Sequence, residues 1–160
     1  MLKLLVYAPC EKVIVATDQT VSIISMMESV RVNVTEGFPA DALAPIRWSI
    51  LSLWKRDQEI LKPVEIEEIS EVVRPDGTVA AGGTSRFTVT NEHLFYRSLV
   101  HVPVFPIGLP GFVKVKCRIR QTNPETEWTE FAEFPLLLVH IPVEPPEQTN
   151  QEIVAPKLDG

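Results

Sequence analysis

The sequence is short of cysteine and contains no long apolar run. Cys10 and Cys117 are its two cysteines, too few for the disulfide framework of a small secreted domain. No stretch approaches the roughly 18 consecutive apolar residues that a membrane helix needs, and the apolar run at residues 1–8 is too short for a signal peptide. We therefore expect a cytoplasmic protein with no membrane partner and with both thiols free.

Positive charge is also in short supply. Fifteen lysines and arginines stand against 21 aspartates and glutamates, which gives a formal net charge of -6. Proteins whose main task is to bind nucleic acid usually carry a surplus of basic side chains, because phosphates must be neutralised. Nucleic acid is therefore not expected as the main partner, and the acidic balance suits a soluble protein whose copies repel one another.

The motifs of common active sites are missing from the sequence. His93, His101 and His140 fall on different expected elements, without the spacing of a metal site. No serine lies in a Gly-x-Ser-x-Gly elbow, and the stretch Gly82-Gly83 lacks the lysine of a phosphate-binding loop. The glutamates are spread over positions expected to face water and form no defined acid–base pair. The sequence thus predicts no enzyme, no cofactor and no metal site.

The clearest positive signal is strict alternation over residues 113–120, directly after the turn at Pro110-Gly111. Apolar side chains occupy the odd positions and basic side chains the even ones. This period of two is typical of an antiparallel strand with one dry face and one wet face. The basic positions, which we call the basic stripe, are Lys114, Lys116, Arg118 and Arg120.

Similar short apolar runs, separated by turn residues, cover most of the chain. Fourteen prolines favour many short strands over long helices. The fold class expected is all-β, a two-layer antiparallel β-sandwich. Residues 21–28 fit either a strand or a helical turn. The other expected strands are residues 2–7, 11–16, 30–34, 46–55, 64–73, 86–90, 94–104, 113–120, 128–132 and 134–141, with Pro135 breaking or bulging the edge between the last two.

Residues 64–73 are the hardest segment to assign. Their glutamates are good helix formers, and Ile66, Ile69 and Val73 fall at helical spacing, so a helix over residues 62–73 stays open as the alternative. We interpret the segment as a strand with a bulge near Glu68, because it runs into a Pro-Asp-Gly turn at residues 75–77. Residues 80–84 are then expected to form a flexible loop.

The order of these pieces resembles a known family of small bacterial proteins. The family is an uncharacterised domain of unknown function with a predicted immunoglobulin-like β-sandwich, and the resemblance covers about residues 4–140. Its motifs are turns and core positions, so the resemblance implies a fold and carries no catalytic residues. Members usually have glycine where Thr20 stands. The matching pieces are the strands through Val6–Val15, Val21–Ile24 and Val30–Val32, with the turns Pro75-Asp76-Gly77 and Pro110-Gly111-Phe112.

The composition changes near residue 142. Residues 1–141 are expected to form the sandwich domain, and residues 142–160 are a tail rich in Pro, Glu and Gln without periodicity. Such a composition cannot bury enough surface to fold alone. The tail is expected to be disordered or held by a partner chain.

Two surfaces are candidates for binding. Strand 46–55 is apolar on both faces, with Trp48 and Trp54 on one face and Leu51 and Leu53 on the other. One of these faces could be buried against another protein. This favours a non-catalytic protein–protein interaction or structural module, which could form oligomers.

The alternative function is a binder of an anionic ligand or nucleic acid that uses the basic stripe. Alternate side chains on a strand lie roughly 7 Å apart, close to the spacing of single-strand phosphates. The competing interpretation is ion pairing within the sheet. The acidic side chains expected to supply it are Glu65, Glu67, Glu71, Glu127 and Glu130.

Overall fold

The computed structural model describes residues 2–18 and 20–143, and the regular elements in these ranges are all β-strands. They are β1 (Leu2–Val15), β2 (Val21–Met26), β3 (Ser29–Val34), β4 (Leu43–Ala44), β5 (Trp48–Arg56), β6 (Val64–Val73), β7 (Val79–Val89), β8 (Phe95–Val102), β9 (Phe105–Pro106), β10 (Gly111–Gln121) and β11 (Thr129–Pro142). The predicted all-β class is confirmed. In the described part of the chain, no helix has the length and hydropathy of a membrane span.

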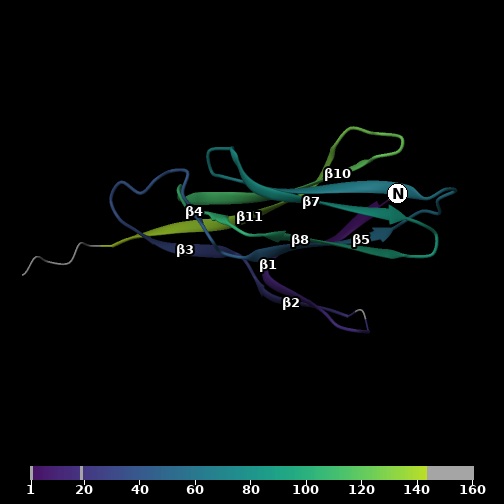
Figure 1. The fold of residues 1–160 in the computed structure, drawn as a ribbon, viewed down its shortest axis with the longest axis horizontal. Helices are drawn as coiled ribbons and strands as arrows, with labels where there is room; N and C mark the ends of the chain where they lie inside the picture. The colour runs from purple at the N-terminus through teal and green to yellow at the C-terminus, as the bar shows by residue number, and fades with distance from the viewer. Residues whose placement is uncertain (1, 19, 144–160) are drawn as a thin grey trace, which may run out of the picture.

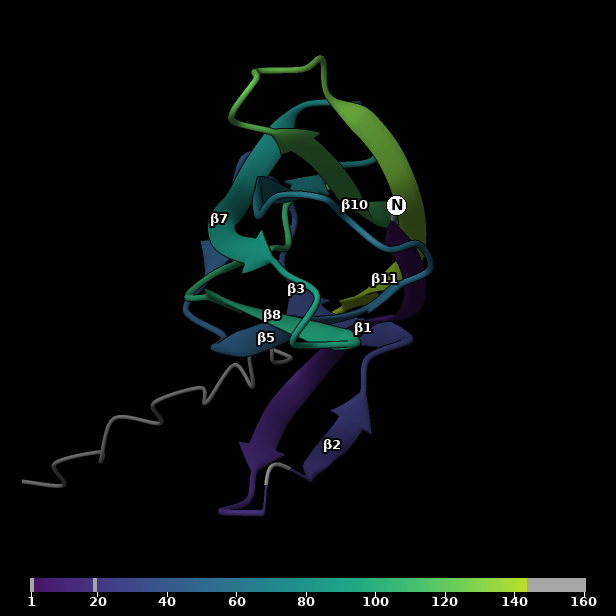
Figure 2. The ribbon, with the colours of Figure 1, turned by 90° about the vertical axis from the view of Figure 1, so that its right-hand side faces the viewer.

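Two sheets pack face to face (Figures 1 and 2). We call β2-β1-β5-β8 the four-stranded sheet and β3-β11-β10-β6-β7 the five-stranded sheet, and β4 and β9 form a small separate pair. The prediction of purely antiparallel sheets is wrong at one place, because β3 and β11 pair in parallel. The chain crosses between the sheets just before β3, where Met27 N–H donates to Pro9 C=O and Leu137 N–H donates to Glu28 C=O.

Strand β10 follows the predicted alternation. Val113, Val115 and Cys117 are fully buried, and the basic side chains between them face outward. The inward side chains of both sheets form two apolar clusters, one around Trp48 and Phe105 and the other around Trp54. The thiols of Cys10 and Cys117 are buried and unpaired, as expected.

Strand β6 confirms the strand interpretation of residues 64–73 and corrects its details. Its register against β10 is regular through Glu68, and the irregularity lies between Val72 and Val73. Glu68 therefore keeps the inward phase of Ile66 and Val72 and is fully buried. Residues 74–78 then turn as predicted, with Gly77 at a φ of 88° that favours glycine.

The flexible loop predicted at residues 80–84 is wrong, because these residues lie inside β7. The two glycines serve close packing. A Cβ on Gly82 would lie 2.5 Å from the Ser70 carbonyl oxygen, and a Cβ on Gly83 would lie 2.5 Å from Val100 Cγ1. Glycine within a strand often marks such a close approach, and here β7 lies tightly against β6 and β8.

Strand β11 is one continuous strand, although two strands flanking Pro135 were expected. Pro135 pairs with Lys114 on the β10 side, and pairing with β3 begins only at Leu137. The proline thus sits where the other side of β11 is still an open edge, which is where strands tolerate it. Val143 is the last described residue, and its N–H donates to Val34 C=O. The predicted tail beyond it lies outside the described residues.

Strand β1 is also continuous, although two runs were expected. Residues 2–10 pair with β5, and residues 10–15 pair with β2. Figure 2 shows the second part of β1 and β2 standing away from the four-stranded sheet as a two-stranded ribbon. We call residues 11–15 together with β2 the arm. The ambiguous residues 21–26 are therefore a strand.

Candidate functional site

A buried polar belt separates the two apolar clusters. Its centre is Glu68, where Ser52 Oγ donates to Oε1 at 2.5 Å and Trp54 Nε1 donates to Oε2 at 2.8 Å. On the neighbouring strand β1, the Tyr7 hydroxyl donates to Ser70 Oγ at 3.2 Å. Among the described residues no basic side chain forms an ion pair with Glu68.

Burial controls the ionisation of this belt. Burial raises the pKa of Glu68 more than the hydrogen bonds from Ser52 and Trp54 lower it. Burial likewise raises the pKa of the Tyr7 hydroxyl and of the Cys117 thiol, and the nearby Glu68 adds to both shifts. A group with no exposed surface cannot meet a substrate, so this belt is a structural feature. The expectation that the glutamates face water is wrong for Glu68. The sequence did contain a signal for this burial, because Glu68 alternates in phase with the apolar residues Ile66 and Val72, which face inward.

The basic stripe is neutralised by neighbouring carboxylates. Lys114 Nζ lies 2.9 Å from Glu133, and Lys116 Nζ lies 3.5 Å from both Glu130 and Glu133. Further along, Arg118 lies 2.5 Å from Glu71. The predicted in-sheet ion pairing is confirmed, although Glu125 and Glu133 stand among the partners in place of Glu65 and Glu127.

Arg120 ends the stripe in a second cluster. It lies 2.7 Å from Glu67, which also binds Arg86 at 2.6 Å, and it forms a further ion pair with Glu125. The two arginines lower the pKa of Glu67 through their hydrogen bonds. The ring of Trp128 covers the guanidinium of Arg120 at 4.7 Å. The four basic side chains of the stripe are thus all paired within the sheet.

The four candidate interface residues of β5 separate into two groups. Trp48 and Trp54 point between the sheets and are 2% and 0% exposed. Leu51 and Leu53 lie on the outer face of the four-stranded sheet, where the register places Leu53 between Val6 and Arg97. Leu51 is only 5% exposed, so of the four residues only Leu53 belongs to a surface that another chain could approach.

The arm carries exposed apolar side chains on both of its faces. Among the large apolar residues of the arm, five keep between 39% and 51% of their surface exposed: Ile14, Val15, Ile23, Ile24 and Met26. A two-stranded ribbon without a covering layer is marginally stable in water. This concentration of exposed apolar surface indicates an interaction site.

The outer edge of β2 also has unpaired backbone groups. Ala16 N–H donates to Thr20 C=O, and hydrogen-bonded pairs alternate along an antiparallel ladder. The N–H and C=O groups of Val21 and Ile23 therefore point away from β1, toward a side where no described strand pairs with β2. The sequence of β2 contains no charged residue, whereas the other sheet-edge strands β3, β7 and β8 contain Arg31, Arg86 and Arg97. Charged side chains are a common protection of an edge, and β2 lacks one.

Two open hollows lie between the arm and the outer face of the four-stranded sheet. One, of about 830 Å³, is lined by Val21 of the arm with Leu53, Phe95 and Arg97 of the sheet. The other, of about 630 Å³, joins the arm to Ser49 and His101. We call the two hollows together the arm cleft, although they have no lining residue in common. The volume of each is in the range of ligand-binding clefts.

The charge of the arm cleft is opposite to that of the whole chain. Lys12, Arg47 and Arg97 line it, with Glu11 as its one lining carboxylate. Neither Lys12 nor Arg47 forms an ion pair with any described residue. Lys12 and Arg47 are thus two cations beside the arm without an ion-pair partner among the described residues, whereas the four cations of the basic stripe are paired.

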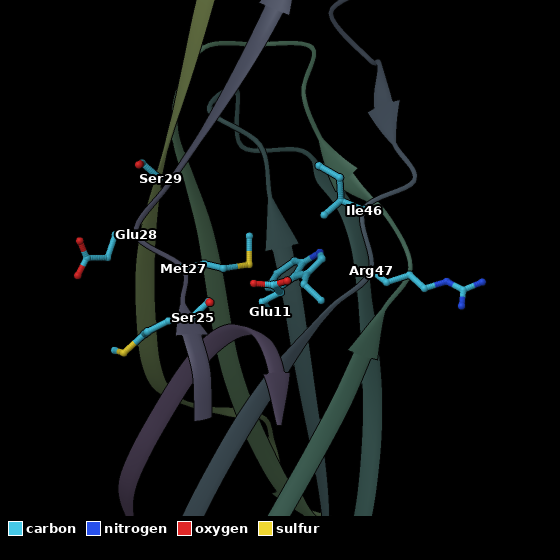
Figure 3. A pocket seen from close by; sticks show the side chains of 9 residues that line it. Glu11, Ser25, Met27, Glu28, Ser29, Ile46 and Arg47 are labelled. Carbon is cyan, nitrogen blue, oxygen red and sulfur yellow. The ribbon is translucent and has the colours of Figure 1, made fainter. Parts of the chain in front are cut away.

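A third hollow lies at the base of the arm and is shown in Figure 3. Its volume is about 400 Å³. Glu11, Ser25 and Met27 point into it, whereas the Glu28 and Arg47 side chains point away. Ser25 has a φ of 51°, a conformation that non-glycine residues rarely adopt. The hollow is small and open, and it marks where the arm bends away from the sheet.

The three histidines do not converge on one site. Ser49 Oγ lies 3.0 Å from His101 Nδ1 in the arm cleft, and His140 Nε2 lies 2.7 Å from the Ile107 carbonyl oxygen. A Ser–His nucleophile also needs a group that orients the imidazole and donors for an oxyanion, and the described contacts of His101 include neither. No group of three or more metal-ligating side chains occurs among the described residues.

Comparison with protein-family models and with curated proteins returns no relative for this chain. No protein-family model matches it, and no curated protein matches it.

Proposed function

We propose that this protein is a non-catalytic interaction module that binds an extended segment of another protein in the arm cleft. The observation that carries the proposal is the arm itself, a ribbon with apolar side chains exposed on both faces and an unpaired backbone edge. An extended peptide beside such an edge gains backbone hydrogen bonds, and apolar pockets select its side chains. The unpaired Lys12 and Arg47 favour a segment of acidic character.

We further propose that the module is immunoglobulin-like. The order β1-β5-β8 opposite β11-β10-β6 corresponds to strands A-B-E opposite G-F-C of an immunoglobulin sandwich. The chain departs from that pattern in having β2, β4 and β9 and no inter-sheet disulfide. Two buried free thiols support the proposal of a reducing, cytoplasmic location.

The test is a capture experiment from lysate of the native host with three versions of the full chain. In the cleft variant, Lys12→Glu and Arg47→Glu reverse the unpaired cations, and in the matched control, Lys116→Glu and Arg118→Glu reverse two cations of the basic stripe. Each variant changes two charges of the same sign. A partner that is lost with the cleft variant, kept with the control and resistant to nuclease is the expected result.

The alternative function, an anionic ligand or nucleic acid bound by the basic stripe, makes the opposite prediction. Its motivation is the row of four cations on one strand face, and its weakness is that each of them already pairs with a glutamate. Under this alternative, binding is lost with Lys116→Glu/Arg118→Glu and with nuclease, and it survives in the cleft variant. That outcome would contradict the proposed function.

A further inference from the structure

One of the two hollows of the arm cleft is rich in hydrogen-bond donors. It is the hollow of about 630 Å³, which we call the donor hollow, and its lining includes Lys12, Arg47, Ser49 and His101. Ser49 and His101 lie opposite each other on β5 and β8. Lys12 belongs to the arm, and Arg47 directly precedes β5. Three separate parts of the chain therefore bring polar side chains to one hollow.

The pair of Ser49 and His101 always has a hydrogen left to donate to a ligand. Ser49 is only 5% exposed, and its Oγ lies 3.0 Å from Nδ1 of the exposed His101. If the hydroxyl donates to Nδ1, the neutral ring carries its hydrogen on Nε2, and if Nδ1 donates, the hydroxyl hydrogen is left over. Among the described residues, neither the hydroxyl nor the ring has a further hydrogen-bond partner. The spare hydrogen is therefore available to an acceptor that enters the hollow.

The two cations of the donor hollow have no counter-charge. Neither Lys12 nor Arg47 forms an ion pair with a described residue. Glu11 lines the donor hollow as well, but its side chain points into the hollow at the base of the arm, from which Arg47 points away (Figure 3). An anion in the donor hollow would therefore meet two positive charges beside the spare hydrogen of the Ser49–His101 pair.

This set of donors fits a phosphate monoester better than a carboxylate. A carboxylate presents two oxygens and a single negative charge. A phosphorylated side chain presents three acceptor oxygens and a charge of about −1.5 to −2 near neutral pH. Arginine binds such a group through its planar fork, and lysine binds it as a point charge. Two cations and a neutral donor pair thus match both the charge and the number of oxygens of the phosphate.

We propose that the donor hollow binds a phosphorylated side chain of the partner segment. This inference rests on the proposed function, because it names the chemical group that the arm cleft selects in its partner. Lys12 and Arg47 bind the phosphate by charge, and the Ser49–His101 pair donates a hydrogen bond to it. The basic stripe does not offer such a site, since each of its four cations is paired with a glutamate.

The first measurement is a titration of the full chain with phenyl phosphate, followed by NMR of the histidine ring signals. Phenyl sulfate is the matched probe, because it has a similar shape and carries only one negative charge. The expected result is a shift of the His101 signals, with those of His140 unchanged, and a dissociation constant for phenyl phosphate lower than that for phenyl sulfate by about tenfold or more. Equal binding of the two probes would overturn the inference.

The same titration with two charge variants locates the site. Lys12→Gln/Arg47→Gln should weaken the binding of phenyl phosphate by about tenfold or more. The matched control is Arg31→Gln/Lys62→Gln, which removes two exposed cations that do not line the donor hollow, and it should bind as the wild type does. Phenyl phosphate bound equally well by the first variant and by the control would also overturn the inference.

Phosphatase treatment of the host lysate separates this inference from the proposed function. Treatment should abolish capture of the partner by the wild-type chain. Capture that survives phosphatase but is lost with Lys12→Glu/Arg47→Glu would overturn the inference and leave the proposed function standing, and phenyl phosphate binding would then indicate a site for a free phosphate compound. Capture that persists with Lys12→Glu/Arg47→Glu would contradict the proposed function itself.

Discussion

At the scale of single residues, the most unusual group is the buried carboxyl of Glu68. Two donors hold it, Ser52 Oγ and Trp54 Nε1, and no described cation compensates it. Burial of a charge without a partner is costly, so the raised pKa of Glu68 means that the native state retains its proton to higher pH than the unfolded chain. The contribution of Glu68 to stability is therefore full below the unfolded pKa and is lost as the pH rises through the folded pKa.

The first prediction concerns Glu68→Gln. The neutral amide accepts from Trp54 and donates to Ser52 without ionising, so the variant should gain in free energy of unfolding relative to wild type as the pH rises from 5 to 9. Urea unfolding at several pH values measures this difference. Glu133→Gln, measured below pH 5, is the control of opposite sign, because Lys114 lowers the pKa of Glu133 and that stabilisation is lost as the pH falls through the folded pKa. A difference for Glu68→Gln that stays constant with pH would contradict the account.

The second prediction concerns the contact of Gly83 with Val100. Gly83→Ala places a methyl 2.5 Å from Val100 Cγ1, inside the packed sandwich. The expected loss is about 1–3 kcal/mol of unfolding free energy, the usual cost of overpacking. Adding Val100→Ala should recover part of the loss, beyond the sum of the single effects. Thr84→Ala, at an exposed position of the same strand, is the control and should change stability by less than about 0.5 kcal/mol. A Gly83→Ala loss no larger than that of the control would refute the packing role.

At the scale of elements, the two outer sheet faces differ in how their charges are compensated. The outer face of the five-stranded sheet alternates basic β10 with acidic positions of β6 and β11, and the cations of β10 are paired. Beside the arm, Lys12 and Arg47 form no ion pair with a described residue. A row of like charges on one strand therefore says little about binding until its neighbours across the ladder are known.

The third prediction tests this ladder. Arg118→Glu should lower the free energy of unfolding by about 1 kcal/mol, because it faces Glu71 with a like charge. The double variant Arg118→Glu/Glu71→Arg should restore most of the loss by reversing the pair. Urea unfolding at low and high salt is the measurement, and the effect should shrink at high salt. Equal losses in the single and double variants would contradict a pairwise interaction.

The fourth prediction concerns the stability of the arm. Because the arm is a ribbon without a covering layer, its amides should exchange with deuterium much faster than those of β5 and β10. Hydrogen exchange resolved by peptide measures this. Arm amides as slow as those of β10 would show that the arm is held as firmly as the core, and would remove one argument for a docking role.

Strands were predicted correctly from the sequence where one face of the strand is buried. The alternation of β10 and the turn after β6 both follow from local chemistry, because burial on one face imposes a period of two. The arm could not be predicted, since a strand that leaves its sheet keeps the same alternation as one that stays. The glycines of β7 look like a loop in sequence, and only the approach of Val100 explains them.

At the scale of the whole molecule, the main feature is the uneven distribution of charge. The chain has a net charge of -6, yet Lys12 and Arg47 line one hollow beside the arm and Arg97 lines the other. These residues come from three distant parts of the sequence, so no local sequence pattern predicts the arm cleft. The two-layer architecture was predictable from strand spacing, whereas the crossing of the chain between sheets, which produces the parallel pair of β3 and β11, depends on tertiary contacts.

The central claim is that a partner protein binds at the arm cleft, and site-specific photo-crosslinking in the native host tests it most directly. Benzoylphenylalanine in place of Val21 reports on the cleft, and the same group in place of Phe112, an exposed residue of the five-stranded sheet, is the matched control. The account predicts a discrete crosslinked protein from position 21 and none from position 112. A crosslink from position 112 alone, or none from position 21, would contradict it.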